Sequence, residues 1–415
     1  METLENIIEN YQKIILKSEQ ELQKTRKQIR NISLLRLFLF IEAVVAAIYF
    51  WDKDWEYILL FSVIPILLFI WLVKRHNLWF YRKDFLKKKI EINNQELCAI
   101  QYDFSNFDGG KEYIDPTHLY TFDLDVFGEH SLFQYINRSS TPIGKQQLAE
   151  WFNHHLEDKE SIEQRQKAIR ELSLDLEFRQ KFRVLGLLYK GKSADISEIN
   201  QWAASASYYR KHAFLRILPS IVTIANILCI SASILGVIPG SIAGIVFVCF
   251  VTFSFIFSKG ITKMQATYGE KLQILSTYAD QILLTEKKEM HSSILKGLKT
   301  ELTSKNQTAS QAVHRLSKLM NALDQRSNLL MSTILNGLLF WELRQVMRIE
   351  KWKESHASDL PRWLEAIGKF DAYCSLATFS YNHPEFIYPQ ISSQSFHLQA
   401  EALGHPPIRK ACCAI

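Results

Sequence analysis

One eight-residue string has the spacing of a phosphate-binding loop, GxxxxGK[ST], in which backbone N–H groups and a lysine cradle nucleotide phosphates. Its four defining residues are Gly186, Gly191, Lys192 and Ser193. A working loop of this kind follows a buried strand and opens a helix. Here the preceding residues 177–184 are charged and have helical spacing, and Asp195 is placed to cap the next helix. We therefore interpret the string as a chance match and predict no cofactor-binding residue in it.

The histidines and cysteines predict neither a catalytic centre nor a metal site. His154 and His155 are adjacent, so their rings would point in different directions on a helix and make a poor metal site. The six cysteines contain no CxxC pair, which favours reduced thiols over disulfides or zinc. Serine and aspartate residues are abundant but come without a positioned base. We predict no catalytic residue and no metal ligand.

The elements that would position any site are helices. The chain has 415 residues, enough for two or three domains, with only 15 glycines and 10 prolines. Its 49 basic and 43 acidic residues give a net charge of +6, too small by itself to indicate nucleic-acid binding. The apolar residues are concentrated in four runs. We predict an all-α fold.

Two apolar runs, residues 37–51 and 57–73, flank a short acidic loop. Each run is close to the roughly 17–25 residues that cross a bilayer, and tryptophans lie at their ends. Glu42 interrupts the first run, and we expect it to snorkel or to face the partner helix. Basic residues lie on both sides, which places both flanks in the cytoplasm. The same basic residues could instead bind DNA or anionic lipid, but we favour the topogenic interpretation.

A second apolar pair, residues 217–235 and 242–257, has the same pattern, with basic residues before and after it. The two pairs predict four transmembrane helices in two hairpins, with every other segment on one side. We therefore expect a multi-pass protein of the inner (cytoplasmic) membrane with its remaining parts in the cytoplasm.

Several further helices are predicted from caps and apolar stripes. Residues 1–32 carry an apolar stripe that fits either a short coiled coil or a helix packed on its own protein. Thr141-Pro142 predicts one helix start, with a hydroxyl cap followed by proline, and Asp158 predicts another. Residues 263–349 predict long helices with mild breaks at 306–310 and Gly337.

Two segments of the chain resemble one family. The first, residues 120–172, contains Asp123 to Gly128, Asn137-Arg138, Thr141-Pro142 with Gly144, and Ile162 to Gln166. This order is similar to the core domain of the MutS DNA mismatch-recognition ATPases. The second segment contains Asp371, Ser375-Leu376-Ala377 and the turn Tyr388-Pro389-Gln390-Ile391, which resembles the end of the MutS lever helices.

The resemblance implies a core and lever that bind mismatched or branched DNA in an ATP-dependent clamp. It also implies a homodimer, and ATP with Mg²⁺ in a P-loop domain. Gly404-His405-Pro406 resembles the entry to that domain, but the residues that follow depart from the family pattern. We interpret the chain as truncated before the ATPase domain, and we expect no cofactor and no ATPase activity in it.

The family reads mismatches with a Phe-Xaa-Glu motif in a separate domain. The two such strings here, starting at Phe40 and Phe127, do not lie in a domain of that kind, so no DNA-contacting residue is assigned. Two alternatives stay open: a non-catalytic membrane-anchored helical scaffold or inactive fragment, and an unrelated membrane sensor.

The predicted organisation has seven parts in chain order. They are an amphipathic helix (1–32), a transmembrane hairpin (33–74), a basic helix with a polar connector (75–119), a MutS-like core segment (120–211), a second transmembrane hairpin (212–260), a lever and core segment (261–392) and an ATPase-entry remnant (393–415).

Overall fold

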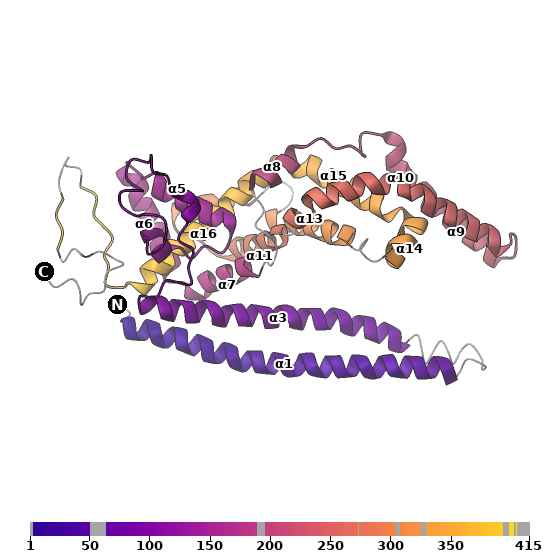
Figure 1. Cartoon of the computed structure of the whole chain (residues 1–415), viewed down its shortest axis with the longest axis horizontal. Helices are drawn as coiled ribbons and strands as arrows, with labels where there is room; N and C mark the ends of the chain where they lie inside the picture. The colour runs from indigo at the N-terminus through magenta and orange to yellow at the C-terminus, as the bar shows by residue number, and fades with distance from the viewer. Residues whose placement is uncertain are drawn as a thin grey trace. The chain divides into compact units, whose positions relative to one another are not determined.

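The computed structural model describes residues 3–49, 64–188, 196–272, 274–303, 308–324, 329–392, 398–401 and 404. In these residues the regular structure is helical apart from one isolated bridge between Thr303 and Thr308, which confirms the all-α prediction (Figure 1). The chain divides into two compact units. The first contains residues 1–137, 175–188 and 378–415, and the second contains residues 138–174 and 189–377.

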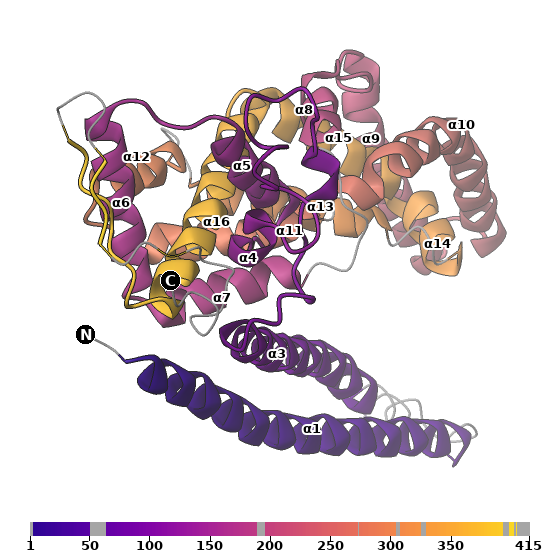
Figure 2. The same cartoon turned by 60° about the vertical axis from the view of Figure 1, so that its left-hand side comes forward.

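The first unit is built on two long helices, α1 (Leu4–Tyr49) and α3 (Ile64–Ile100), which lie side by side in opposite directions (Figures 1 and 2). The buried residues of α1 recur at three-, four- and seven-residue intervals, the spacing of one helix face. In its N-terminal part they are Ile7, Tyr11, Ser18, Leu22 and Thr25, and further along they are Leu39, Ala43 and Ala46. The N-terminal stripe therefore packs on the chain's own α3.

The first unit also contains three short helices and the C-terminal end of α16 (Leu360–Asn382). The short helices are the 3₁₀ helix η2 (Lys111–Tyr113), α4 (Leu132–Ile136) and α7 (Leu176–Leu187). Ser131 and Asp175 cap α4 and α7 by accepting the N–H of Gln134 and Phe178.

The second unit contains eleven helices in the residues that the structure describes. They are α5 (Pro142–Asn153), α6 (Lys159–Ser173), α8 (Ile196–Ala204), α9 (Ala213–Ile234), α10 (Gly240–Leu272), α11 (Ile274–Lys287), α12 (Ser293–Glu301), α13 (Ala309–Asp324), α14 (Leu329–Leu339), α15 (Trp341–His356) and α16 (Leu360–Asn382), the last belonging to this unit as far as Ala377.

The two predicted helix starts in this unit are confirmed. The Thr141 side chain accepts the N–H of Gly144, and Pro142 is the first residue of α5. The Asp158 side chain accepts the N–H of Ser161 at the start of α6. Both caps satisfy an N–H group that has no partner within its own helix.

The prediction of long helices for residues 263–349 is wrong in two places. The chain breaks between α11 and α12, where no break was predicted, and α13 packs on both α11 and α15. The second break falls at Phe340, whose φ of 49° is left-handed, and not at Gly337, which lies inside α14. A Cβ atom on Gly337 would lie 2.4 Å from the Phe247 ring, so this glycine permits close helix packing.

The second predicted apolar pair forms the hairpin of α9 and α10. Within the described residues, these are the two helices long and apolar enough to cross a membrane, at Ala213–Ile234 and Gly240–Lys263. The sequence predicted four such helices. For the first pair, α1 is described as far as Tyr49 and α3 from Ile64, and residues 50–63 lie outside the described part of the chain. The described chain therefore contains two candidates instead of four.

Candidate functional site

A buried carboxylate joins two segments that are far apart in the sequence. Asp371 lies on α16 with 1% of its surface exposed. Its Oδ2 accepts the Thr141 N–H at 2.8 Å and the Thr141 hydroxyl at 2.7 Å. The Ser140 N–H and hydroxyl donate to the same carboxylate at 3.0–3.1 Å. The start of α5 is thus held on α16 by four donors, and we call this arrangement the Asp371 joint.

Two further contacts extend the Asp371 joint. The Arg138 N–H donates to the Ser375 hydroxyl, one turn further along α16, at 2.6 Å. Gln281 on α11 donates through Nε2 to the Ser140 hydroxyl at 3.1 Å. The joint therefore gathers α5, α11 and α16 around one polar centre inside an apolar core.

Burial raises the pKa of Asp371 from 3.8 to about 6, and the hydrogen bonds from Thr141 and Ser140 act in the opposite direction. Because a pKa of about 6 lies below neutral pH, the carboxylate is mostly ionised at pH 7. A Cβ atom on Gly144 would lie 2.2 Å from Asp371 Oδ2, so backbone closes this side of the carboxylate. A carboxylate that is enclosed in this way and supplied with donors fits a structural role, not proton transfer to a substrate.

Glycine and aromatic residues hold the two helices together around the joint. A Cβ atom on Gly368 would lie 2.1 Å from Ile143 Cγ2, which shows how closely α16 approaches α5. The Trp151 ring on α5 packs 4.7 Å from the Tyr373 ring on α16, measured between centroids. The Arg165 guanidinium of α6 lies over the same Trp151 ring, with its carbon atom 4.4 Å from the ring centroid.

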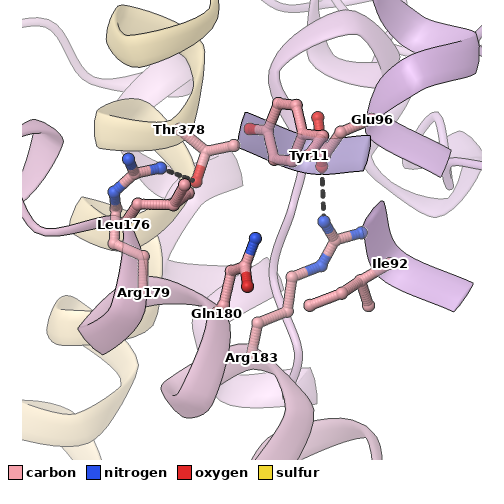
Figure 3. Close-up of a pocket in the computed structure, with 8 residues that line it drawn as sticks. All are labelled: Tyr11, Ile92, Glu96, Leu176, Arg179, Gln180, Arg183 and Thr378. Carbon is pink, nitrogen blue, oxygen red and sulfur yellow. Dashed lines mark hydrogen bonds and ion pairs between the residues drawn. The ribbon is translucent and has the colours of Figure 1, made fainter. Parts of the chain in front are cut away.

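The first unit has its own polar cluster around a small pocket (Figure 3). Glu96 on α3 pairs with Arg183 on α7; the Glu96 side chain is buried and the Arg183 side chain is largely covered. Glu96 also accepts from Asn382, which in turn accepts the Tyr11 hydroxyl at 2.7 Å. Arg179 donates to Thr378 at 3.0 Å. Because these polar groups bond to one another, the cluster ties α1, α3, α7 and the end of α16 together.

The string with phosphate-loop spacing is only partly described. Gly186 is buried within helix α7, and the Leu188 N–H completes helical hydrogen bonds to Val184 and Leu185. This part of the string presents helix where a phosphate loop needs free N–H groups. Gly191, Lys192 and Ser193 lie outside the described residues, so the interpretation as a chance match stays a prediction.

The other residues considered for chemistry are dispersed. His154 and His155 are exposed, and each lies beside a different glutamate. Among the described residues no group of three His, Cys, Asp or Glu is arranged to hold a metal ion. Phe127 is 7% exposed and packs on Tyr113 and Phe133, whereas Phe40 is exposed on the apolar part of α1. Phe127 is therefore a core residue in this unit.

Comparison with known families identifies the helical body. The family model described as MutS domain III matches residues 117–377, which is more than half of the chain. The chain belongs to the MutS family. The residues of both motif segments that meet at the Asp371 joint lie within the matched domain III, whereas the turn at Tyr388 to Ile391 lies beyond it. The MutS resemblance on which the sequence analysis relied is thus confirmed.

One curated relative covers a smaller region. The DNA mismatch repair protein MSH3 of Lodderomyces elongisporus is 32% identical over 124 residues, which are 28% of this chain and 12% of that protein. The similarity therefore spans about an eighth of the relative's length. No solved structure matches the chain. The chain is thus similar to a DNA mismatch repair protein over part of its length.

The sequence predicted the motifs around Thr141 and around Asp371, but it did not predict that they contact one another. Gln281 and Gly368 were missed as members of the joint. Gln281 is a polar residue with 0% exposure inside the apolar stripe of α11, and Gly368 falls in an otherwise well-formed helix. A polar residue in the middle of an apolar stripe is the signal that would have marked Gln281.

Proposed function

We propose that this chain is a membrane-anchored MutS-related protein that binds mismatched or branched DNA as the core and lever part of an ATP-dependent clamp. The observation that carries the proposal is the match to MutS domain III over residues 117–377. The relationship to an MSH3 mismatch repair protein supports the same assignment. The Asp371 joint fits this role, because a clamp that transmits force through helices needs a firm connection between its segments.

The apolar surface of α9 and α10 supports the membrane anchor. Large apolar side chains along both helices are exposed, including Ile224, Leu228, Val248 and Phe255. Such a surface on a hairpin of spanning length suits contact with lipid acyl chains. Helix α1 has exposed apolar residues of the same kind, namely Leu37, Phe38, Ile41 and Val45. Their exposure supports including the first hairpin in the anchor, which then crosses the inner membrane four times.

ATP with Mg²⁺ would act in a P-loop domain of the clamp. The residues described here do not fit that ligand, because Gly186 to Leu188 are helical and their N–H groups are bonded within α7. We therefore propose no nucleotide-dependent step for this chain. A homodimer is part of the proposal because the clamp would consist of two copies of the chain.

DNA binding is tested with the full chain in detergent and three labelled DNAs: a matched duplex, the same duplex with one mismatched base pair, and a four-way junction. We expect a mobility shift whose affinity falls as salt concentration rises, because phosphate contacts release counterions. Tighter binding of the mismatched duplex would support mismatch recognition, and tighter binding of a four-way junction would support branched DNA.

The absence of a shift at low salt, with a folded chain, would contradict the DNA-binding proposal. The chain would then fit the alternative of a non-catalytic membrane-anchored scaffold. Circular dichroism of the same sample provides the control for folding, because the described chain is helical and would lose this signal if it unfolded.

A further inference from the structure

A third apolar helix packs beside the α9–α10 hairpin. Helix α14, Leu329–Leu339, has the sequence LLMSTILNGLL and contains no charged residue. It contacts both α10 and α9, and it lies next to them in both views of the molecule (Figures 1 and 2). Met331 and Ile334 on α14 are 46% and 48% exposed. Because α14 packs on the hairpin, these two apolar residues lie beside its exposed apolar surface.

The packing shows how far α14 extends along α10. Ser332 shares the Glu342 carboxylate with Ser258, which lies at the basic end of the apolar stretch of α10. Gly337 packs against Phe247 and Val251 further inside that stretch. Ser332 and Gly337 are five residues apart, which is roughly 7.5 Å along α14 at 1.5 Å per residue. Between these two residues α14 runs from near the basic end of the hairpin into its apolar part.

The chain then turns back at Phe340. This residue has a left-handed backbone and is 1% exposed, with its ring among those of Phe250, Phe253 and Phe257 on α10. Helix α15 starts directly afterwards, and Arg344 on it donates to the Pro219 carbonyl near the start of α9. Helices α14 and α15 thus form a hairpin that enters and leaves on the same side.

Several polar groups at this turn are paired within the protein. The Asn226 amide of α9 donates to the carbonyls of Gly337 and Leu338 at 2.9 and 3.2 Å, where the end of a helix leaves carbonyls without partners. Asn336 donates to Glu342 and accepts the Glu342 N–H. Irregular backbone is tolerated at membrane depth only when its polar groups are paired within the protein, and the Gly337 and Leu338 carbonyls and the Glu342 N–H are paired in this way.

We propose that α14 and the Phe340 turn form a re-entrant segment that enters the lipid bilayer beside the α9–α10 hairpin. The occupant of the exposed Met331 and Ile334 face is lipid, because this face continues the apolar surface of that hairpin. The inference rests on the proposed membrane anchor. It adds an element that connects the bilayer directly to α15 within domain III.

The test uses the full chain in vesicles of phosphatidylethanolamine and phosphatidylglycerol with single nitroxide labels. The labels are placed on Ile334→Cys, on native Cys249, which is exposed on α10, and on Leu174→Cys, which is exposed after α6, with the other cysteines replaced in each case. Collisions with oxygen and with a water-soluble nickel complex are compared. We expect oxygen to dominate at Ile334 and Cys249, and the nickel complex to dominate at Leu174.

The three labels separate the two proposals. A nickel-dominated label at Ile334 with an oxygen-dominated label at Cys249 would overturn the re-entrant segment and leave the membrane anchor intact. Nickel-dominated labels at both positions would overturn the anchor and the inference that rests on it.

A second variant tests the packing of α14 on α10. Gly337→Leu places side-chain atoms where Phe247 and Val251 already lie, so we expect it to lift α14 and to shift the Ile334 label towards the Leu174 value. The Cys249 label should not change. An unchanged Ile334 label in the Gly337→Leu chain would contradict the packing on which the re-entrant segment depends.

Discussion

At the residue scale, Asp371 connects two segments of the matched domain that are far apart in the sequence. It is fully buried, yet it carries a charge at neutral pH because the backbone and hydroxyl groups of Ser140 and Thr141 surround it with donors. Thr141 has two roles, since its hydroxyl donates to Asp371 and accepts the Gly144 N–H at the start of α5. One side chain thereby fixes both the beginning of α5 and its position on α16.

Replacing Asp371 with alanine should destabilise the protein strongly. The change leaves the buried N–H groups of Ser140 and Thr141 without an acceptor, at about 1–3 kcal/mol each, so we expect a loss of about 2–6 kcal/mol in the free energy of unfolding. Urea unfolding of the detergent-solubilised chain, followed by tryptophan fluorescence, measures it. Asp371→Asn keeps one acceptor oxygen and should lose less, and an alanine variant as stable as the parent would contradict the role of the joint.

The raised pKa of Asp371 makes stability depend on pH in a defined direction. Between 3.8 and about 6 the folded protein holds a proton on this carboxyl that the unfolded chain has released. The free energy of unfolding should therefore fall as the pH rises through this window and become flat above it, by up to about 3 kcal/mol at 1.36 kcal/mol per pKa unit.

The measurement is the urea midpoint of the parent chain and of Asp371→Asn across that pH window. The asparagine variant cannot titrate at this position, so its stability should lack this part of the pH dependence. Parallel pH profiles for the two chains would contradict a raised pKa at Asp371.

At the element scale, glycines determine how closely the helices approach. Gly144 and Gly368 bring α5 onto α16, and Gly337 brings α14 onto α10. In each case the missing Cβ atom leaves room for a side chain or a carboxylate of the partner helix. The apolar stripes of α11, α13 and α15 pack on one another, which accounts for the short helices where the sequence predicted long ones.

Two glycine-to-alanine changes should have opposite effects. Gly368→Ala places a Cβ atom 2.1 Å from Ile143 Cγ2, and we expect overpacking to cost about 1–3 kcal/mol. Gly297→Ala lies on the exposed face of α12 with no atom within 4 Å, and it should stabilise the helix by about 0.5–1 kcal/mol. Thermal unfolding of both variants gives the comparison, and equal shifts would contradict close packing at Gly368.

At the scale of the whole molecule, a MutS domain III is interrupted by an apolar hairpin. Helices α9 and α10 lie inside the matched residues 117–377, between α8 and α11. A membrane anchor placed there would hold domain III by its own helices instead of by a terminal extension. We propose that this arrangement keeps the DNA-binding body of the clamp at the membrane surface.

Reporter fusions test this topology in the intact cell. The proposed topology keeps the basic flanks of both hairpins in the cytoplasm. We therefore expect a periplasmic signal for a fusion at Pro239, in the turn between α9 and α10, and for a fusion at Asp54. A fusion at Leu174 should report the cytoplasm. A cytoplasmic signal at Pro239 would contradict the α9–α10 anchor, and one at Asp54 alone would leave one hairpin in place of two.

The sequence by itself determined the features that depend on neighbours along the chain. The caps at Thr141 and Asp158 form with N–H groups three residues away, and the apolar stretch of α9 and α10 defines their hairpin, so both could be predicted. The order of the MutS motifs identified the family in the same way.

Only the tertiary structure decided which distant residues meet. Asp371 accepts from Thr141 across 230 positions, and Gln281 reaches Ser140 across 141. The left-handed turn at Phe340 likewise depends on the aromatic rings of α10 and on Asn226 of α9. These contacts are set by the packing of separate helices, because a carboxylate or a carbonyl is stabilised by whichever donor the fold brings to it. Local spacing does not determine that donor.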